Sequence, residues 1–123
     1  MRRLSLIALL LLSSPAWAEW VEVDRSEGAA VYIDPATIKK EGHLRRAWSL
    51  VELRKPESSG GLSRKHFMEY DCKDERVRIL QASVSRGPMG RGEITGNTSS
   101  PSDWSYIAPG MVAEKIFRYV CAR

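Results

Sequence analysis

The first 18 residues of the chain have the three-part layout of a secretory signal peptide, and this limits the size and setting of the fold. A basic start at residues 2–3 precedes an apolar run at residues 4–12, and small residues flank Trp17 just before Glu19. The apolar run is too short to span about 30 Å of hydrocarbon, which needs roughly 20 residues. We therefore expect cleavage of residues 1–18, which leaves one exported domain over residues 19–123.

The exported part is expected to carry neither an anchor nor a strong charge. Glu19, rather than a cysteine, follows the expected cleavage site, so we expect no lipid attachment and no stable membrane anchor. Without Arg2 and Arg3, the 19 basic residues fall to 17 against 15 acidic ones, a net charge of +2. This balance and export both argue against a nucleic-acid partner. We expect the domain in the periplasm or at the cell surface.

Two cysteines, Cys72 and Cys121, are the only ones in the chain. Export into an oxidising compartment favours a disulfide, and two cysteines allow only one intramolecular connectivity. The bridge would close a loop of about 50 residues and stabilise the fold by roughly 4 kcal/mol. The alternative is a reactive or metal-binding pair, but the spacing is not that of a CxxC motif and no histidine is near.

Hydrophobic periodicity predicts an α+β fold. Alternating or β-branched segments, separated by Gly- and Pro-rich turns, predict a meandering antiparallel sheet of about five to six strands. These expected strands cover residues 20–24, 29–33, 44–55, 64–72, 76–85 and 104–107. Val112, Ile116 and Val120 repeat every four residues and predict one C-terminal helix.

Three details of this prediction concern individual segments. In the segment 76–85 the apolar positions change parity after Ile79, which indicates a β-bulge. Asp34 and Pro35 suit the start of a helix, so residues 36–40 are expected to form a short helical turn. Residues 96–103 are mostly polar and are expected to form a loop.

The chain shows no set of residues that would predict catalysis. The glycine-rich segment 87–92 lacks the lysine of a phosphate-binding loop, and no serine sits in a Gly-x-Ser-x-Gly turn. His43 and His66 have no ligand-spaced partners. We therefore expect no enzymatic activity, no cofactor and no metal site.

Basic residues cluster at one predicted hairpin. If segments 44–55 and 64–72 pair, the side chains of Arg54, Lys55, Arg64 and Lys65 meet near its tip. A positive tip can attract an acidic protein or a polyanion. The alternative is ordinary solvation of these side chains beside nearby glutamates.

Short motifs along the chain resemble, in order and spacing, those of the surface-adhesin protein E-like family. They are Val31-Tyr32-Ile33-Asp34-Pro35, Ala47-Trp48-Ser49-Leu50, Glu69-Tyr70-Asp71-Cys72, Met89-Gly90-Arg91-Gly92, Trp104 with Ile107-Ala108-Pro109-Gly110, and Tyr119-Val120-Cys121. The resemblance covers nearly all of residues 19–123. It implies an antiparallel sheet with a C-terminal helix, a Cys72–Cys121 bridge, a Gram-negative source and adhesion to host proteins.

Two functions are expected from these observations. The first is an exported, non-enzymatic binding module that contacts a protein or polyanionic partner, as the resemblance and the absence of catalytic sets indicate. The second is a periplasmic accessory or structural domain of the envelope, which needs no anchor. A sheet edge could also pair with a second copy to form a homodimer.

Overall fold

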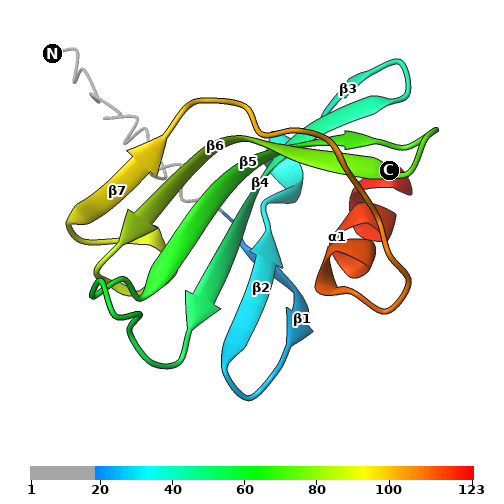
Figure 1. The fold of residues 1–123 in the computed structure, drawn as a ribbon. Helices are drawn as coiled ribbons and strands as arrows, with labels where there is room; N and C mark the ends of the chain where they lie inside the picture. Colours follow the sequence, from blue (N-terminus) through cyan, green and yellow to red (C-terminus); the bar gives the residue numbers. More distant parts are fainter. Residues whose placement is uncertain (1–18) are drawn as a thin grey trace, which may run out of the picture.

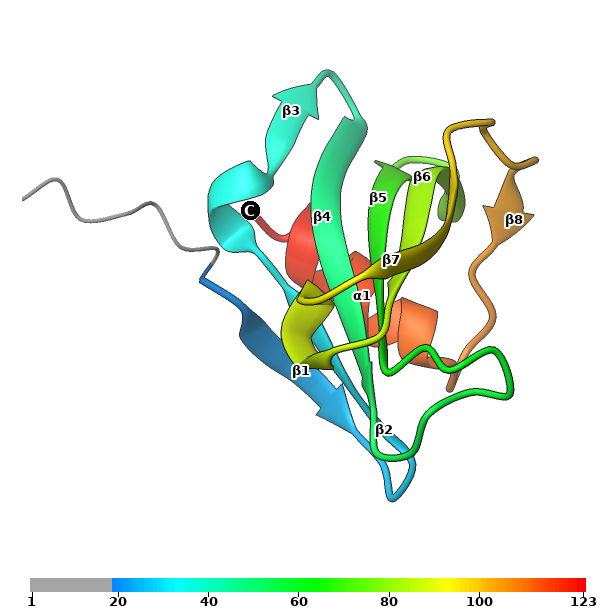
Figure 2. The ribbon, with the colours of Figure 1, turned by 90° about the vertical axis from the view of Figure 1, so that its left-hand side faces the viewer.

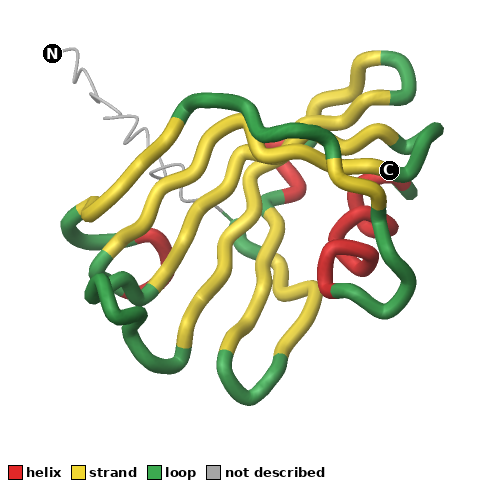
Figure 3. The backbone as a smooth tube through the Cα atoms, in the orientation of Figure 1, coloured by secondary structure: helices red, strands yellow, loops and turns green. Residues whose placement is uncertain are grey.

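The computed structural model describes residues 19–123, so the predicted signal peptide at residues 1–18 lies outside the described residues. Within these residues, an antiparallel sheet is covered on one face by a single helix (Figure 1; Figure 3 shows the same view by secondary structure). The strands are β1 (Val21–Arg25), β2 (Ala29–Ile33), β3 (Lys39–Glu41), β4 (Leu44–Leu53), β5 (Ser63–Asp71), β6 (Arg76–Ser85), β7 (Ile94–Thr98) and β8 (Ser105–Tyr106). The helix is α1 (Val112–Cys121), and two 3-10 turns are η1 (Pro35–Thr37) and η2 (Pro88–Gly90).

The sheet has the order β1-β2-β4-β5-β6-β7, with β3 paired to β4 and β8 paired to β6. Every pair is antiparallel. The α+β prediction is therefore confirmed, although over residues 19–123 the sheet has eight strands rather than five to six. The long strands β4, β5 and β6 form its centre, which explains why β4 carries apolar residues on both faces.

The two additional strands lie in segments that were predicted to be other structures. Residues 36–40 do not form the expected helical turn, because only Pro35–Thr37 turns and Lys39–Glu41 extends as β3. Asp34 does cap this turn, since its Oδ1 accepts from Ala36 N at 3.2 Å. The expected polar loop at residues 96–103 begins instead within β7, whose five residues are all exposed.

The predicted bulge lies in β6. Phe67 pairs with Gln81 and Met68 pairs with Ile79, so Leu80 has no partner opposite it in β5. The extra residue shifts the alternation of β6 by one position. Apolar residues before and after the bulge therefore point to the same face of the sheet, as the change of parity in the sequence indicated.

That face packs against α1 and is called the helix face here. Phe117 and Val120 of α1 are buried against a set of sheet residues that are themselves buried: Ile33, Ala47, Tyr70 and Val77. The disulfide between Cys72 and Cys121 joins the end of β5 to the last residue of α1, which confirms the predicted pairing. Its Cα atoms are 5.7 Å apart. The bridge holds the C-terminal end of α1 at the Leu44 end of β4, because Cys72 N donates to His43 O.

The opposite face is partly covered by short segments, as Figure 2 shows from the side away from α1. Leu50 has no exposed surface, and Gly90 of η2 lies so close to it that an added Cβ would contact its side chain. The Trp48 and Phe67 rings stack on this face with their centroids 5.0 Å apart. Over residues 19–123, no helix has both the length and the apolar character that crossing a membrane requires.

The start of α1 gives a prediction about stability. Met111 occupies the N-cap with an extended backbone (φ −77°, ψ 153°), and its side chain accepts no hydrogen bond. We expect Met111→Ser to raise the free energy of unfolding by about 0.5–2 kcal/mol, because a serine hydroxyl can accept from the first free N–H groups of the helix. Urea denaturation measures this change. Met111→Ala, which removes the same side chain without adding an acceptor, is the control, and an equal stability of the two variants would contradict the cap.

Candidate functional site

One end of the sheet brings together two turns that are distant in the sequence. The turn between β1 and β2 lies beside the end of β4, since Arg54 N donates to Gly28 O at 3.0 Å. Leu53 N in turn donates to Leu62 O at 2.9 Å, which closes the start of the β4–β5 loop. We call this region the basic end and define it by Arg25, Arg54 and Lys55. It lies at the opposite end of β4 from the disulfide.

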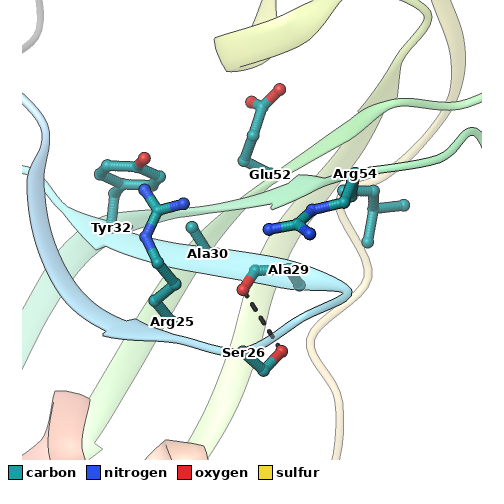
Figure 4. A pocket seen from close by; sticks show the side chains of 8 residues that line it. Arg25, Ser26, Ala29, Ala30, Tyr32, Glu52 and Arg54 are labelled. Carbon is teal, nitrogen blue, oxygen red and sulfur yellow. Dashed lines mark hydrogen bonds between the residues drawn. The ribbon is translucent and has the colours of Figure 1, made fainter.

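A pocket of about 180 Å³ opens at the basic end. Figure 4 shows the side chains around it, which come from β1, β2 and the end of β4. They are Arg25, Ser26, Ala29, Ala30, Tyr32, Glu52, Leu53 and Arg54. The pairings Ala30↔Glu52 and Arg25↔Ala30 place these residues on three adjacent strands. The pocket therefore depends on the sheet topology rather than on one loop.

The two arginines of the pocket are available to an anionic group. Arg54 forms no ion pair within residues 19–123. In the part of the chain that the structure describes, Arg25 pairs only with Glu22, and both side chains of that pair are well exposed, at 58% and 39%. Exposed ion pairs of this kind contribute little. An incoming carboxylate can therefore compete for the Arg25 guanidinium at a small cost.

Glu52 is the acidic group of the pocket. Its Oε2 accepts from Met89 N at 2.6 Å and so ties η2 to the end of β4. Figure 4 shows its carboxylate turned away from the two guanidinium groups. Oε1 accepts no hydrogen bond in the described part of the chain, so it remains free to accept from a ligand.

The four basic residues predicted from the sequence do not form one cluster. Arg54 and Lys55 lie together and line a hollow with Glu27 and Gly28. Arg64 and Lys65 are neighbours in β5, and strand alternation sends their side chains to opposite faces.

Each of these two β5 side chains has its own partner. The guanidinium of Arg64 bonds Glu57 at 2.6 Å in the β4–β5 loop, and this hydrogen bond lowers the pKa of Glu57. Lys65 lies over the Trp48 ring, with Nζ 5.2 Å from its centroid. Sequence reasoning missed Arg25, which the alternation of residues 20–24 and their pairing with residues 29–33 could have located.

A second cavity, of about 230 Å³, lies between the sheet and α1. Its lining is mostly apolar: Val31, Ser49, Val51, His66, Met68, Tyr70, Val77, Ile79, Val112, Ala113 and Ile116. Burial lowers the pKa of His66, and the charge of Arg64 on the same strand lowers it further. His66 is therefore neutral near pH 7, and this cavity offers no charged group to a ligand.

The most buried carboxylates serve the fold. Burial raises the pKa of Glu69, but hydrogen bonds from Arg46 Nε (2.7 Å) and Arg78 Nε (2.9 Å) outweigh it and lower the pKa overall. Burial also raises the pKa of Asp71, but hydrogen bonds from backbone N–H groups at the β5–β6 turn and from Arg76 outweigh it and lower the pKa overall. Both acids stay ionised and paired, which does not suit proton transfer. Among residues 19–123, no group of three or more His, Cys, Asp or Glu side chains is placed to hold a metal ion.

Comparison with known proteins identifies relatives over nearly the whole chain. The model of the family described as surface-adhesin protein E matches residues 20–122. A solved structure of protein E from Haemophilus influenzae is similar, with a TM-score of 0.63, 14% identity, and coverage of 81% of this chain and 91% of that chain. A structure of protein E from non-typeable Haemophilus influenzae gives a TM-score of 0.66 at 13% identity, with coverage of 90% and 82%. No curated protein matches the sequence.

The buried histidine predicts a pH dependence of stability. Because the pKa of His66 is lower in the folded chain than the ordinary value of 6.5, the unfolded chain binds this proton first as the pH falls. We expect the free energy of unfolding to be constant above about pH 7 and to fall below about pH 6.5. The fall is at most about 1.4 kcal/mol per pH unit, since one proton is involved.

Urea denaturation between pH 7.5 and 5.5 measures this fall, which His66→Phe should remove. His43→Gln is the control, because His43 is exposed in the turn after β3. The same pH dependence in the His66→Phe variant as in the unaltered chain would assign the effect to other groups.

Proposed function

Because the chain belongs to the surface-adhesin protein E family and is an adhesin-like binding module, we propose that its basic end is the surface that contacts an acidic partner. The family match and the protein E fold give no support to the alternative of an envelope accessory domain. We also propose that the domain acts at the cell surface rather than in the periplasm, since the family is one of surface adhesins. A host protein or a host polyanion would be the partner.

The observation that carries this proposal is a pair of basic side chains at the end of the sheet that form no ion pair within residues 19–123. Arg54 and Lys55 sit just beyond β4, and Arg25 reaches the same pocket from β1. Arg64 and Lys65 flank this end on the two faces of the sheet, as residues of the same proposed contact surface. Positive charge concentrated on exposed turns increases the rate of association with a negatively charged surface.

The position of the basic end also suits a contact surface. The core that holds α1 gathers Ile33, Ala47 and Phe117, and the disulfide lies at the other end of β4. A partner bound at the basic end therefore meets residues that the core does not use. Catalysis is not needed for this role, and the two most buried carboxylates are already neutralised by arginines.

Charge reversal at the basic end tests the proposal. We expect the double substitution Arg54→Glu with Lys55→Glu to weaken adhesion of domain-coated beads to cultured epithelial cells by about tenfold or more, roughly 1.4 kcal/mol. We also expect the dependence of adhesion on NaCl concentration to flatten, because fewer charge contacts remain to be screened. Bead counts at several salt concentrations measure both effects.

A matched control changes the net charge by the same amount elsewhere. Lys39→Glu with Lys40→Glu reverses two exposed cations of β3, at the other end of β4. Adhesion should be nearly unchanged in this control. An equal loss in both double variants would show that net charge alone matters, and undiminished adhesion in the Arg54/Lys55 variant would exclude the basic end.

Location is tested separately by protease treatment of intact cells that express the tagged chain, with a periplasmic protein as the internal control. Digestion of the tagged chain alone is the expected result. Protection until the outer membrane is opened would confine the domain to the periplasm.

A further inference from the structure

The pocket of the basic end contains polar and acidic side chains beside its two arginines, and this composition favours some acidic ligands over others. Arg25 and Arg54 are the donors for one anionic group, and a planar guanidinium can bind a carboxylate through two parallel hydrogen bonds. Arg54 has no competing ion pair in the described part of the chain. A ligand carboxylate between the two arginines would thus replace only the exposed Glu22 contact.

Three other polar groups suit hydroxyls rather than further charge. An ionised carboxylate only accepts hydrogen bonds, and Oε1 of Glu52 is free to do so. Ser26 Oγ lies at the rim, where it donates to Ala29 O at a long 3.3 Å. Tyr32 adds an aromatic ring and a hydroxyl to one wall of the pocket, beside Arg25 (Figure 4).

The size of the pocket restricts the ligand to about one ring. Its volume is about 180 Å³, whereas a cavity of about 150 Å³ accommodates benzene. Ala29 and Ala30 line the pocket, and their small side chains leave this space open. The pocket can therefore seat about one sugar unit of a polymer.

The negative charge of Glu52 argues against ligands that carry several charges close together. A run of aspartates or a sulfated chain would bring additional anions next to this carboxylate, which like-charge repulsion disfavours. A ligand with one carboxylate and several hydroxyls matches both the arginines and Glu52. That combination is the chemistry of an acidic sugar.

We infer that the pocket formed by Arg25, Tyr32, Glu52 and Arg54 binds one acidic monosaccharide unit of a glycan, with its carboxylate on the two arginines and a hydroxyl on Glu52. This inference rests on the proposed function, since it specifies the chemistry that the basic end recognises. It assigns Tyr32 and Glu52 a role that charge alone would not require.

The test is a titration of the ¹⁵N-labelled chain, residues 19–123 with its disulfide formed, followed by amide chemical shifts. The probes are methyl glucuronide, methyl glucoside and acetate, which carry the carboxylate and the ring together or one of them alone. We expect methyl glucuronide to shift the amides of residues 25–32 and 52–55 and to bind at least tenfold more tightly than the other two. N-acetylneuraminic acid, titrated in parallel, distinguishes a nine-carbon acidic sugar from a uronic acid, and tighter binding of either one supports the inference.

Conservative variants distinguish specific hydrogen bonding to a carboxylate from nonspecific attraction between opposite charges. Arg54→Lys keeps the charge but removes the planar guanidinium that can form two parallel hydrogen bonds to a carboxylate. We therefore expect glucuronide affinity to fall about tenfold. Glu52→Gln should reduce the preference for the sugar over acetate. Arg118→Lys on α1, where the arginine is 68% exposed, is the matched control and should bind as the unaltered chain does.

The outcomes also separate this inference from the proposed function. Equal affinity for glucuronide and acetate, shifts outside the pocket, or full affinity in Arg54→Lys would overturn the sugar site. If charge reversal at Arg54 and Lys55 still abolished cell adhesion, the basic end would remain the contact surface with a different ligand. Unchanged amide spectra away from the pocket show that each variant is folded, so loss of binding cannot be ascribed to unfolding.

Discussion

The packing of α1 against the centre of the sheet is the interaction on which the rest of this structure depends. Phe117 and Val120 cover Ile33, Ala47 and Tyr70, which would otherwise lie exposed on one face of the long strands. Each fully buried side chain of this size stabilises the fold by about 1.5–3 kcal/mol. The disulfide fixes only the last turn of the helix. The cavity beside Val112 and Ile116 shows that the first turns of α1 are packed less completely.

Much of this architecture could be predicted from local sequence patterns. The limits of residues 29–33 and 76–85 match β2 and β6, because β-branched residues and turn-forming residues define them clearly. The parity change after Ile79 located the bulge at Leu80, since strand alternation has a period of two. The disulfide followed from export and from the cysteine count alone.

The strands β3 and β7 were not predicted, because neither of them buries side chains. All residues of β3 and β7 are exposed, so neither strand shows a pattern of apolar and polar residues. The pocket was missed for a different reason: Arg25 and Arg54 are brought together by the pairing of three strands. Treating residues 64 and 65 as one cluster overlooked alternation, which separates their side chains. The sequence shows which side chains are basic. Which of them lie close together depends on how the strands pair.

The separation of the basic end from the core has a consequence for how such domains diversify. Ser26, Arg54 and Lys55 lie on turns whose side chains are exposed and do not support α1, and surface substitutions usually change stability by no more than about 0.5 kcal/mol. Substitutions at these turns are therefore expected to change thermodynamic stability little. The architecture itself tolerates extensive sequence change, as the similarity of this fold to protein E at 14% identity illustrates.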